Sequence, residues 1–600
     1  MNRQRPDRAT LILLLLLIIP VIWAAVLAAP LLAEGLPGLI KGLPGIDPAN
    51  VTWTADTPRT ILIFLLAYGM GLMIYYSTRR NYRRLEEHGS ARWGDAAALC
   101  RKYRDRKSPN QNKLLTQNVS IGLNGRKHRR NLNTLVIGGS GAGKTRFFCK
   151  PNVMQANTSF VILDPKGEIL RDTGYLLEKK GYVIKVLDLI DMGKSHGYNP
   201  FAYIRDENDV LKLVTNLIRN TTPKGSQSND PFWERSETAL LQALILYLVE
   251  EAPTDEQNFP MVMEMIAASG ASEGEEVYES IIDELFARLA MERPESVAVK
   301  QYGIYKQAPG KTAKSILISC GARLAPFDIP QLREIMSYDE LELDKLGDEK
   351  SALFFLISDT DTTYNFLVAL AFSQMFNLLC ERADNTYGGR LPYHVRVLWD
   401  EAANTGQVPG LEKIVAVIRS REISLTLFYQ AMSQCKALYK DHSETIMGNM
   451  DSIVFLGGRE ASTLKDISEN WLGKATISMQ TEGRSRGQSE SYSQNMQRLG
   501  RELMTTSEIT TMPGDKCILQ LRGLPPFLSP KYDLKKHPNY KYTAEFDKKK
   551  NAFRLESLFR HRPLRLKPED EYTVYEVDGS DTDEEADLLN FDDLDSDEFV

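Results

Sequence analysis

The chain has 600 residues, of which 43% are hydrophobic and 25% are charged, so it is too long for one simple core and too apolar to be disordered throughout. Its six cysteines form no C-x-x-C pair and no metal-ligand spacing with the seven histidines, which indicates reduced, mostly buried thiols in a reducing compartment. The net charge is −6, but residues 569–600 hold fifteen acidic side chains and no basic one, so the remainder carries about +9 and could contact nucleic acid.

Two apolar segments near the start of the chain are long enough to cross a bilayer. Twenty-five uncharged residues follow Arg8 and 19 follow Arg59, whereas about 18 suffice for a spanning helix. We therefore predict spans at about 9–33 and 60–78. A secretory signal peptide is the competing interpretation of the first segment, although its apolar stretch is longer than a signal core usually is.

The basic residues around these segments predict their orientation. They gather at 3–8 and 79–84, on the outer sides of the two segments, whereas the loop between the segments holds Lys41. Because Lys and Arg concentrate on the cytoplasmic side, we expect two spans with both the N-terminus and the C-terminus in the cytosol.

A glycine-rich turn follows the apolar run 132–137, which predicts a short buried strand. The turn fits G-x-x-x-x-G-K-[ST], the phosphate-binding loop, in which glycines let N–H groups point at phosphate oxygens, the lysine reaches the β- and γ-phosphates and the threonine binds Mg²⁺. The predicted nucleotide-binding residues are Gly138, Gly139, Ser140, Gly141, Ala142, Gly143, Lys144 and Thr145, of which Lys144 is also catalytic and Thr145 also a metal ligand. A glycine-rich surface turn is the alternative, and the strand before it and the helical pattern after it disfavour that interpretation.

Short apolar runs that resemble buried parallel strands recur along the chain, separated by helical patterns, and predict a doubly wound α/β sheet. These runs are 160–163, 183–187, 352–357, 395–398, 425–428 and 453–456. Between about 206 and 330 only helical spacing remains, which predicts an all-α insertion. The stretch 476–497 is rich in Ser, Gln, Arg and Gly and is predicted to be a mobile polar loop.

These signals divide the chain into predicted domains. They are a membrane anchor at 1–84, a nucleotide-binding domain whose first part is 85–205, an all-α domain at 206–330, the second part of the nucleotide-binding domain at 331–545, and an acidic disordered tail at 546–600. The acids of the tail are spaced by Leu and Phe, a pattern that fits either a peptide that docks on a basic partner or a solvated terminus.

A phosphate-binding loop needs an acid to complete a catalytic site, and the end of the predicted strand 395–398 supplies a pair. In P-loop ATPases of this type, the first acid of such a pair holds the water shell of Mg²⁺ and the second polarises the attacking water. Asp400 and Glu401 fit these roles in that order. The alternative is an acidic N-cap for the following helix, and Asp400 could serve as both.

Two further positions are candidates for catalytic roles. Gln430 comes just after the predicted strand 425–428, where its side chain could touch the γ-phosphate or its water, or could simply end the strand. Arg421 and Arg419 precede the same strand. An arginine there could reach into a neighbouring subunit's site as an arginine finger, or could form a salt bridge on its own helix.

Taken together, these residues resemble the type IV coupling proteins, the membrane-anchored hexameric ATPases of bacterial conjugation and type IV secretion. The resemblance covers about 10–540. It rests on the phosphate-binding loop and the acid pair, and on Gly89–Gly94, Asp164–Glu168, Tyr198–Phe201, Phe232–Trp233, Arg421–Leu425, Gln430 and Ser433–Gln434. Trp399, where a smaller aliphatic residue is usual, and Ala402–Asn404, where a phenylalanine is frequent, depart from the family pattern without touching the chemistry.

The resemblance implies a RecA-like P-loop NTPase fold, ATP and Mg²⁺ as cofactors, and a homohexamer in the bacterial cytoplasmic membrane. It also implies single-stranded DNA, the relaxase and relaxosome accessory proteins, and components of the type IV secretion channel as partners. Such a protein would couple the relaxosome to the channel and pump DNA with its relaxase. The alternatives are a septal DNA translocase of the same superfamily, and a substrate-docking receptor whose ATP site only gates assembly.

Overall fold

The computed structural model describes residues 8–32, 47–48, 51–78, 86, 88–222, 231–270, 279–485 and 491–559. The acidic residues of the predicted tail at 569–600, and most of the basic residues that flank the predicted spans, lie outside the described residues. The chain divides into two compact units, Met1–Ser90 with Ala475–Arg501, and Ala91–Lys474 with Glu502–Val600.

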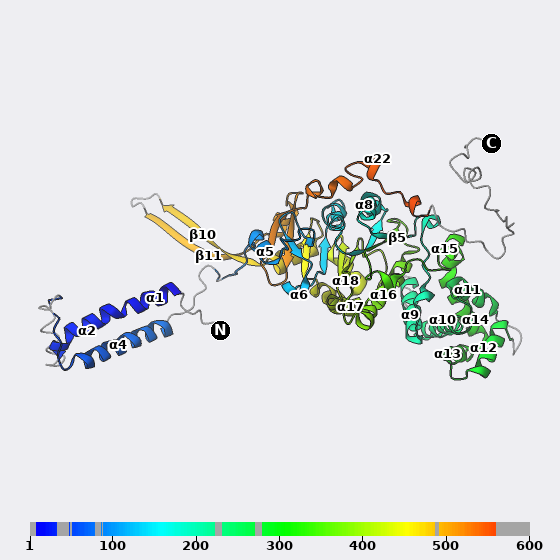
Figure 1. Ribbon diagram of the computed structural model, residues 1–600, viewed down its shortest axis with the longest axis horizontal. Helices are drawn as coiled ribbons and strands as arrows, with labels where there is room; N and C mark the ends of the chain where they lie inside the picture. Colours follow the sequence, from blue (N-terminus) through cyan, green and yellow to red (C-terminus); the bar gives the residue numbers. More distant parts are fainter. Residues whose placement is uncertain are drawn as a thin grey trace, which may run out of the picture. The chain divides into compact units, whose positions relative to one another are not determined.

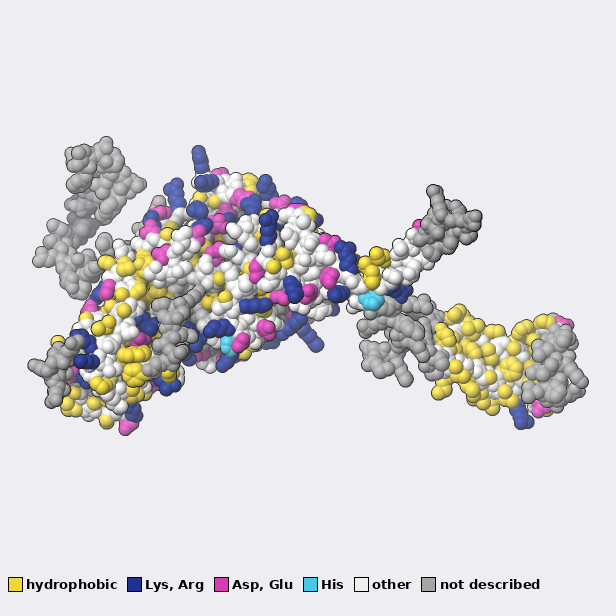
Figure 2. Space-filling view, turned by 180° about the vertical axis from the view of Figure 1, so that it is seen from behind, with side chains coloured by type: hydrophobic (Ala, Val, Ile, Leu, Met, Phe, Trp, Pro, Cys, Tyr) yellow, Lys and Arg dark blue, Asp and Glu magenta, His cyan; other side chains and the backbone are white. Residues whose placement is uncertain are grey.

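The first unit contains helices where both membrane spans were predicted. Helices α1 (Arg8–Leu16) and α2 (Ile18–Leu32) occupy the first span, and α4 (Thr57–Thr78) occupies the second. The hydroxyl of Tyr68 on α4 donates a 3.0 Å hydrogen bond to the carbonyl oxygen of Leu14 on α1. Hydrophobic side chains cover the face of these helices that Figure 2 shows, and two segments here are long and apolar enough to cross a membrane.

The first unit also contains a long β-hairpin, so the mobile loop predicted for 476–497 is wrong for the described residues. Its strands are β10 (Lys474–Ser485) and β11 (Ser491–Glu502), which form a two-stranded sheet of their own. Met479 and Met496, one on each strand, are 49% and 68% exposed. The described side chains of β10 and β11 are largely exposed. The sequence of these strands therefore lacks the alternation of apolar and polar residues that marks a half-buried strand.

The second unit is built on one nine-stranded sheet with the order β13-β12-β9-β3-β8-β7-β4-β6-β5. Its strands are β3 (Thr134–Ile137), β4 (Ser159–Pro165), β5 (Val183–Asp188), β6 (Ser351–Ile357), β7 (Val395–Trp399), β8 (Ile423–Tyr429), β9 (Ser452–Phe455), β12 (Lys516–Leu521) and β13 (Phe527–Pro530). Strands β3 to β9 are parallel, so all seven carboxyl ends meet at one edge of the sheet, whereas β12 and β13 extend it antiparallel beyond β9. The predicted α/β sheet is confirmed.

Helices cover both faces of this sheet, as Figure 1 shows. One face packs against the helices α5 (Ala96–Tyr103), η2 (Thr145–Cys149), α7 (Lys150–Met154) and α8 (Glu168–Lys179). The other face packs against α16 (Asn365–Glu381), α17 (Leu411–Val417), α18 (Met432–Tyr439) and α19 (His442–Gly448). Helix α16 is apolar enough to span a membrane, but 72% of its most apolar window is buried in this core.

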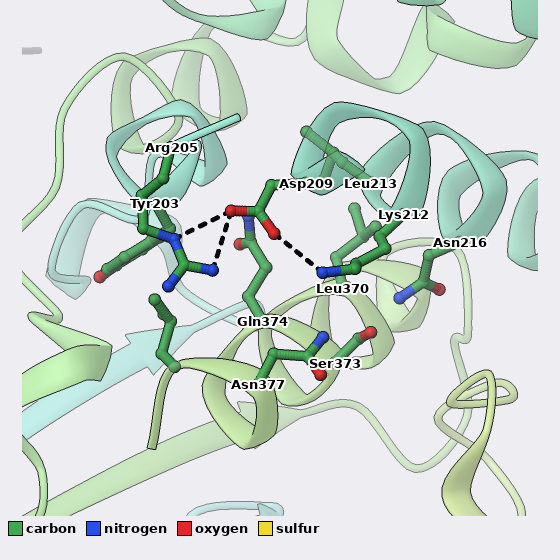
Figure 3. Close-up of a pocket in the computed structure, with 11 residues that line it drawn as sticks. Tyr203, Arg205, Asp209, Lys212, Leu213, Asn216, Leu370, Ser373, Gln374 and Asn377 are labelled. Atoms are coloured by element: carbon green, nitrogen blue, oxygen red, sulfur yellow. Dashed lines mark hydrogen bonds and ion pairs between the residues drawn. The ribbon is translucent and has the colours of Figure 1, made fainter. Parts of the chain in front are cut away.

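The described residues of the predicted all-α insertion, and those just after it, form helices joined by turns. These helices are α9 (Glu207–Thr221), α10 (Pro231–Glu251), α11 (Phe259–Ala268), α12 (Ile281–Glu292), α13 (Val297–Lys306), α14 (Gly310–Leu324) and α15 (Pro330–Ile335). Beside α9 lies a crevice of about 20 Å³, room for about one water molecule, where Asp209 lies between Arg205 and Lys212 (Figure 3). This crevice is too small to hold a nucleotide.

Candidate nucleotide site

The glycine-rich turn lies at the carboxyl end of β3 and leads directly into η2. Gly141 and Gly143 have φ angles of +75° and +80°, which glycine adopts far more readily than other residues. A Cβ atom on Gly143 would lie 2.4 Å from the ring of Phe147. The N–H of Gly139 is bonded to the carbonyl oxygen of Gly457 after β9 at 2.8 Å, so a neighbouring strand end anchors the loop.

The side chains of Lys144 and Thr145 both form defined hydrogen bonds within this region. Lys144 is 9% exposed, and its Nζ donates to the carbonyl oxygen of Gly138 at 3.0 Å, back across the loop. The hydroxyl of Thr145 donates to Oδ2 of Asp400 at 2.7 Å, although 255 residues separate the two. Strand β7, which precedes Asp400, is separated from β3 by β8 alone, so the sheet closes this gap.

Two buried carboxyl groups lie in this region, those of Asp400 and Asp164, and neither forms an ion pair with a basic side chain that the structure describes. Burial raises the pKa of Asp400 to about 6, against the hydrogen bond from Thr145, which lowers it. Burial also raises the pKa of Asp164, at the end of β4, to about 8, against two backbone hydrogen bonds from Leu170 and Ile169. A charged Asp400 also raises the pKa of Asp164, and a charged Glu401 raises that of Asp400. A divalent cation brought in by a nucleotide would offset this excess of negative charge.

The oxygen donors present fit Mg²⁺, which prefers hydroxyl, carboxylate, water and phosphate oxygens. Thr145 and Asp400 would hold it, with the phosphates supplying further ligands. Across the ranges that the structure describes, no group of three His, Cys, Asp or Glu side chains is arranged to bind a metal ion without such help.

Glu401 and Gln430 lie at the same edge of the sheet. Glu401 has a φ of +50°, and its carboxylate accepts a 3.0 Å hydrogen bond from Nδ2 of Asn404. Gln430 is exposed directly after β8, the strand between the phosphate-binding loop and Asp400. The N–H of Gly138 is bonded to the carbonyl oxygen of Tyr429 at 3.0 Å, which ties the end of β8 to the start of the loop. Sheet order thus brings the predicted loop, acid pair and glutamine together.

Arg419 and Arg421 are not brought to this edge. They lie on η8 (Ile418–Arg421), before β8, and a seven-residue strand separates the two edges by roughly 20 Å. Arg421 is paired with Asp384, with Nη2 to Oδ2 at 2.6 Å, and Arg419 donates to the carbonyl oxygen of Gly125 at 3.2 Å. Both line an open groove of about 510 Å³. Within one chain, neither arginine reaches the phosphate-binding loop.

The structure adds residues that the sequence pattern did not reveal. Lys531, just after β13, donates from Nζ to the carbonyl oxygen of Ala142 in the loop at 3.0 Å, and its ammonium lies 5.2 Å from the ring centre of Phe147. Arg146 forms two hydrogen bonds, at 2.6 and 2.7 Å, with the carboxylate of Glu545. The chain after β13 therefore covers the start of η2, the helix that follows the phosphate-binding loop and is called the loop helix below. No motif marks these contacts, because they depend on where β13 ends.

Trp399, the departure from the family pattern, is fully buried on β7. Its Nε1 donates to the hydroxyl of Thr405 at 2.7 Å, and its ring meets that of Phe372 on α16 edge to face at 4.6 Å. The larger side chain is thus accommodated by the helix behind the acid pair, with its one polar atom satisfied.

Comparisons with known proteins converge on one family. The family described as Type IV secretory system Conjugative DNA transfer matches residues 92–551. The conjugal transfer protein TraG of Rhizobium radiobacter is 23% identical over 402 residues, 65% of this chain and 60% of that protein. The protein VirD4 of Rhizobium radiobacter is 23% identical over 467 residues, 74% of this chain and 63% of that protein. The chain thus spans about 60% of the length of these relatives.

Solved structures share the fold. The bacterial conjugative coupling protein TrwBdeltaN70, with sulphate bound, has a TM-score of 0.53 at 17% identity, covering 75% of this chain and 95% of that one. TrwB in complex with ADP and Mg²⁺ has a TM-score of 0.52 at 17% identity, covering 75% of this chain and 95% of that one. TrwB has also been solved with the non-hydrolysable ATP analogue ADPNP, with a TM-score of 0.52 at 16% identity, covering 74% of this chain and 93% of that one.

Proposed function

The chain belongs to the type IV secretory system conjugative DNA transfer family, and we propose that it is a membrane-anchored ATPase that couples the relaxosome to a type IV secretion channel. In this proposal, ATP hydrolysis drives single-stranded DNA, with its relaxase, towards the channel. The hydrogen bond from Thr145 to Asp400 is the observation that carries the proposal, because it joins the two halves of a P-loop ATPase site on this fold.

The proposed cofactors are ATP and Mg²⁺, which the complexes of TrwB with ADPNP and with ADP and Mg²⁺ support. The N–H groups of the loop and the ammonium of Lys144 bind the phosphates, and Thr145 and Asp400 hold the metal ion. Glu401 accepts the proton of the attacking water, and Gln430 orients that water from the neighbouring strand end. Burial of Lys144 and Asp400 strengthens these electrostatic contacts.

The proposed oligomer is a homohexamer, in which the site is completed across a subunit boundary. Arg421 lies at the sheet edge opposite the phosphate-binding loop, so it could stabilise transition-state charge only in a neighbouring copy. The open groove beside it gives a neighbour access. To act in this way, Arg421 exchanges its ion pair with Asp384 for one with a phosphate.

The proposed location is the bacterial cytoplasmic membrane, with two spans and both termini in the cytosol. The apolar helices α2 and α4 fit such an anchor. The proposed partners are single-stranded DNA, the relaxase with relaxosome accessory proteins, and components of the secretion channel. The positive charge of the chain before its acidic end suits contact with DNA phosphates.

Hydrolysis of ATP by the detergent-solubilised full chain, with and without single-stranded DNA, tests this proposal. We expect Mg²⁺-dependent hydrolysis that rises at least severalfold with DNA, an increase that added salt reduces. Nucleotide binding without any turnover would instead favour a docking receptor. Stimulation by duplex but not by single-stranded DNA would favour a septal translocase.

A further inference from the structure

Asp164 lies next to Asp400 on the neighbouring strand. Strands β4 and β7 pair in parallel with Leu163 opposite Trp399, so the next residues, Asp164 and Asp400, follow in the same register about 5 Å apart. Each comes two residues after a side chain of the same core cluster, Ile162 and Leu398. Because alternate residues of a strand share a face, both carboxyl groups lie on the face covered by the loop helix.

One oxygen of Asp164 has a clear structural role. Oδ2 accepts hydrogen bonds of 2.8 Å from the N–H groups of both Ile169 and Leu170, in the first turn of α8. Lys166 and Gly167, with φ angles of +79° and +65°, form the tight turn that brings this helix end back over the strand. Asp164 therefore caps α8 through a single oxygen.

The other oxygen of Asp164 has no such role. Oδ1 is buried and has no hydrogen-bond partner among the described residues. An unpaired buried carboxylate oxygen costs free energy, and here it lies beside a second buried acid. The nearest cation in sequence, Lys166, is paired with Asp359 at 2.6 Å in the loop after β6. Oδ1 of Asp164 is therefore an acceptor that neither α8 nor a described basic side chain satisfies.

We propose that Asp164 is a second carboxylate of the magnesium site, where Oδ1 accepts a hydrogen bond from a water molecule of the metal ion that Thr145 and Asp400 hold. It is a positioning residue that acts through this water. The inference depends on the proposed ATP site and assigns a role to the segment Asp164–Glu168, which otherwise only turns the chain from β4 into α8. It also explains why a helix cap that a neutral side chain could form is made here by an acid.

The substitution Asp164→Asn separates the two roles. The amide oxygen of asparagine can accept the same two N–H groups of α8, but the neutral side chain cannot accept a hydrogen bond from metal-bound water through its other atom. Binding of a fluorescent ATP analogue to the detergent-solubilised full chain is measured as Mg²⁺ is titrated. We expect the Mg²⁺ concentration for half-maximal tight binding to rise at least tenfold, while the thermal melt without nucleotide stays within a few degrees. The variant Asp164→Ser, whose hydroxyl can also accept from the helix, should give the same shift if Asp164→Asn folds poorly.

Asp188 provides a matched control in the same sheet. It ends β5, and the register places it opposite Leu356 of β6, which in turn lies opposite Asp164. Its Oδ1 likewise accepts from two N–H groups, those of Ile190 and Asp191, but the residue opposite it on the adjacent strand is Leu356 and not a second acid. The variant Asp188→Asn should leave the Mg²⁺ dependence unchanged.

The outcomes distinguish this inference from the proposed function. Equal Mg²⁺ dependence in the wild type and in Asp164→Asn would overturn the role of Asp164 and leave it as a helix cap, with the ATPase unaffected. An equal shift in Asp188→Asn would also overturn it, because the effect would then be general to buried acids of the sheet. A wild-type chain that binds no nucleotide at any Mg²⁺ concentration would overturn the proposed function itself.

Discussion

The hydroxyl of Thr145 and the carboxylate of Asp400 are joined by a 2.7 Å hydrogen bond across 255 residues of sequence. This contact places the end of the phosphate-binding loop against the acid pair. Because β8 lies between β3 and β7, Gln430 is placed at the same edge.

Lys144→Ala should abolish ATP turnover, with a loss of at least a hundredfold, about 2.7 kcal/mol of transition-state stabilisation. The reason is that the ammonium of Lys144 is the main positive charge on the β- and γ-phosphates. The measurement is steady-state ATP hydrolysis, with membrane insertion checked by fractionation. Lys150→Ala is a matched control, because Lys150 lies on α7 and contacts Asp172 at 3.4 Å instead of the loop. Equal loss in both variants would contradict a specific role for Lys144.

Glu401→Gln should bind ATP normally but hydrolyse it at least a hundredfold more slowly, because an amide cannot accept the proton of the attacking water. Glutamine can still accept the hydrogen bond from Asn404, so the local structure should be kept. Equilibrium binding of an ATP analogue and single-turnover hydrolysis separate the two effects. Normal hydrolysis by this variant would show that another group is the base.

Arg421→Ala should impair hydrolysis in the oligomer at least tenfold, about 1.4 kcal/mol, while nucleotide binding to monomers stays intact. Mixing these subunits with Glu401→Gln subunits should partly restore hydrolysis, since complete sites then form at some boundaries. No recovery in any mixture would argue against action in a neighbouring site and make Arg419 the next candidate.

Asp384→Asn distinguishes a finger from a structural ion pair. Within one chain, the carboxylate of Asp384 accepts hydrogen bonds from Nε and Nη2 of Arg421. If Arg421 only stabilised this region, losing its partner would reproduce the defect of Arg421→Ala. If Arg421 acts on a neighbour's phosphate, Asp384→Asn should hydrolyse ATP at least as fast as the wild type.

His537 should make the segment that covers the loop helix sensitive to acid. Its Nδ1 accepts the N–H of Asn539 at 3.1 Å, so Nε2–H donates to Oε1 of Gln155 at 3.2 Å, and both nitrogens are satisfied in the neutral ring. Burial lowers its pKa from 6.5 to about 4.

The unfolded chain therefore binds a proton at this histidine between pH 6.5 and 4 while the folded chain does not, so stability is lost as the pH falls through this window. The shift corresponds to at most about 3 kcal/mol. Thermal melts of the full chain from pH 7.5 to 4.5 should show this loss in the wild type and a flatter profile in His537→Gln. Parallel profiles would contradict a contribution from His537.

Much of the fold could be predicted because its central strands are buried on both faces. Runs such as Phe160–Leu163 and Ala352–Ile357 are continuously apolar, and all seven predicted parallel strands lie in one sheet. Strands β10 and β11 could not be predicted in this way, since their pairing depends on backbone hydrogen bonds and leaves no trace in side-chain polarity.

The parts of the site in which the chemistry requires particular residue types could be predicted from the sequence. The parts in which strand pairing decides which residues are neighbours could not. The loop and the acid pair follow from the spacing that phosphate and metal require, and sheet order then brings them together. The adjacency of Asp164 and Asp400 depends on β4 lying beside β7, and the contact of Lys531 with Ala142 depends on where β13 ends. No local sequence pattern predicts either of these two contacts between distant segments.

Transfer of DNA by donor cells whose only copy of this chain carries Lys144→Ala tests most directly whether ATP hydrolysis drives transfer. The chain should reach the membrane in normal amounts, and the transfer frequency should fall to the limit of detection, whereas Lys150→Ala donors should transfer normally. Near-normal transfer by the Lys144→Ala donors would contradict the account.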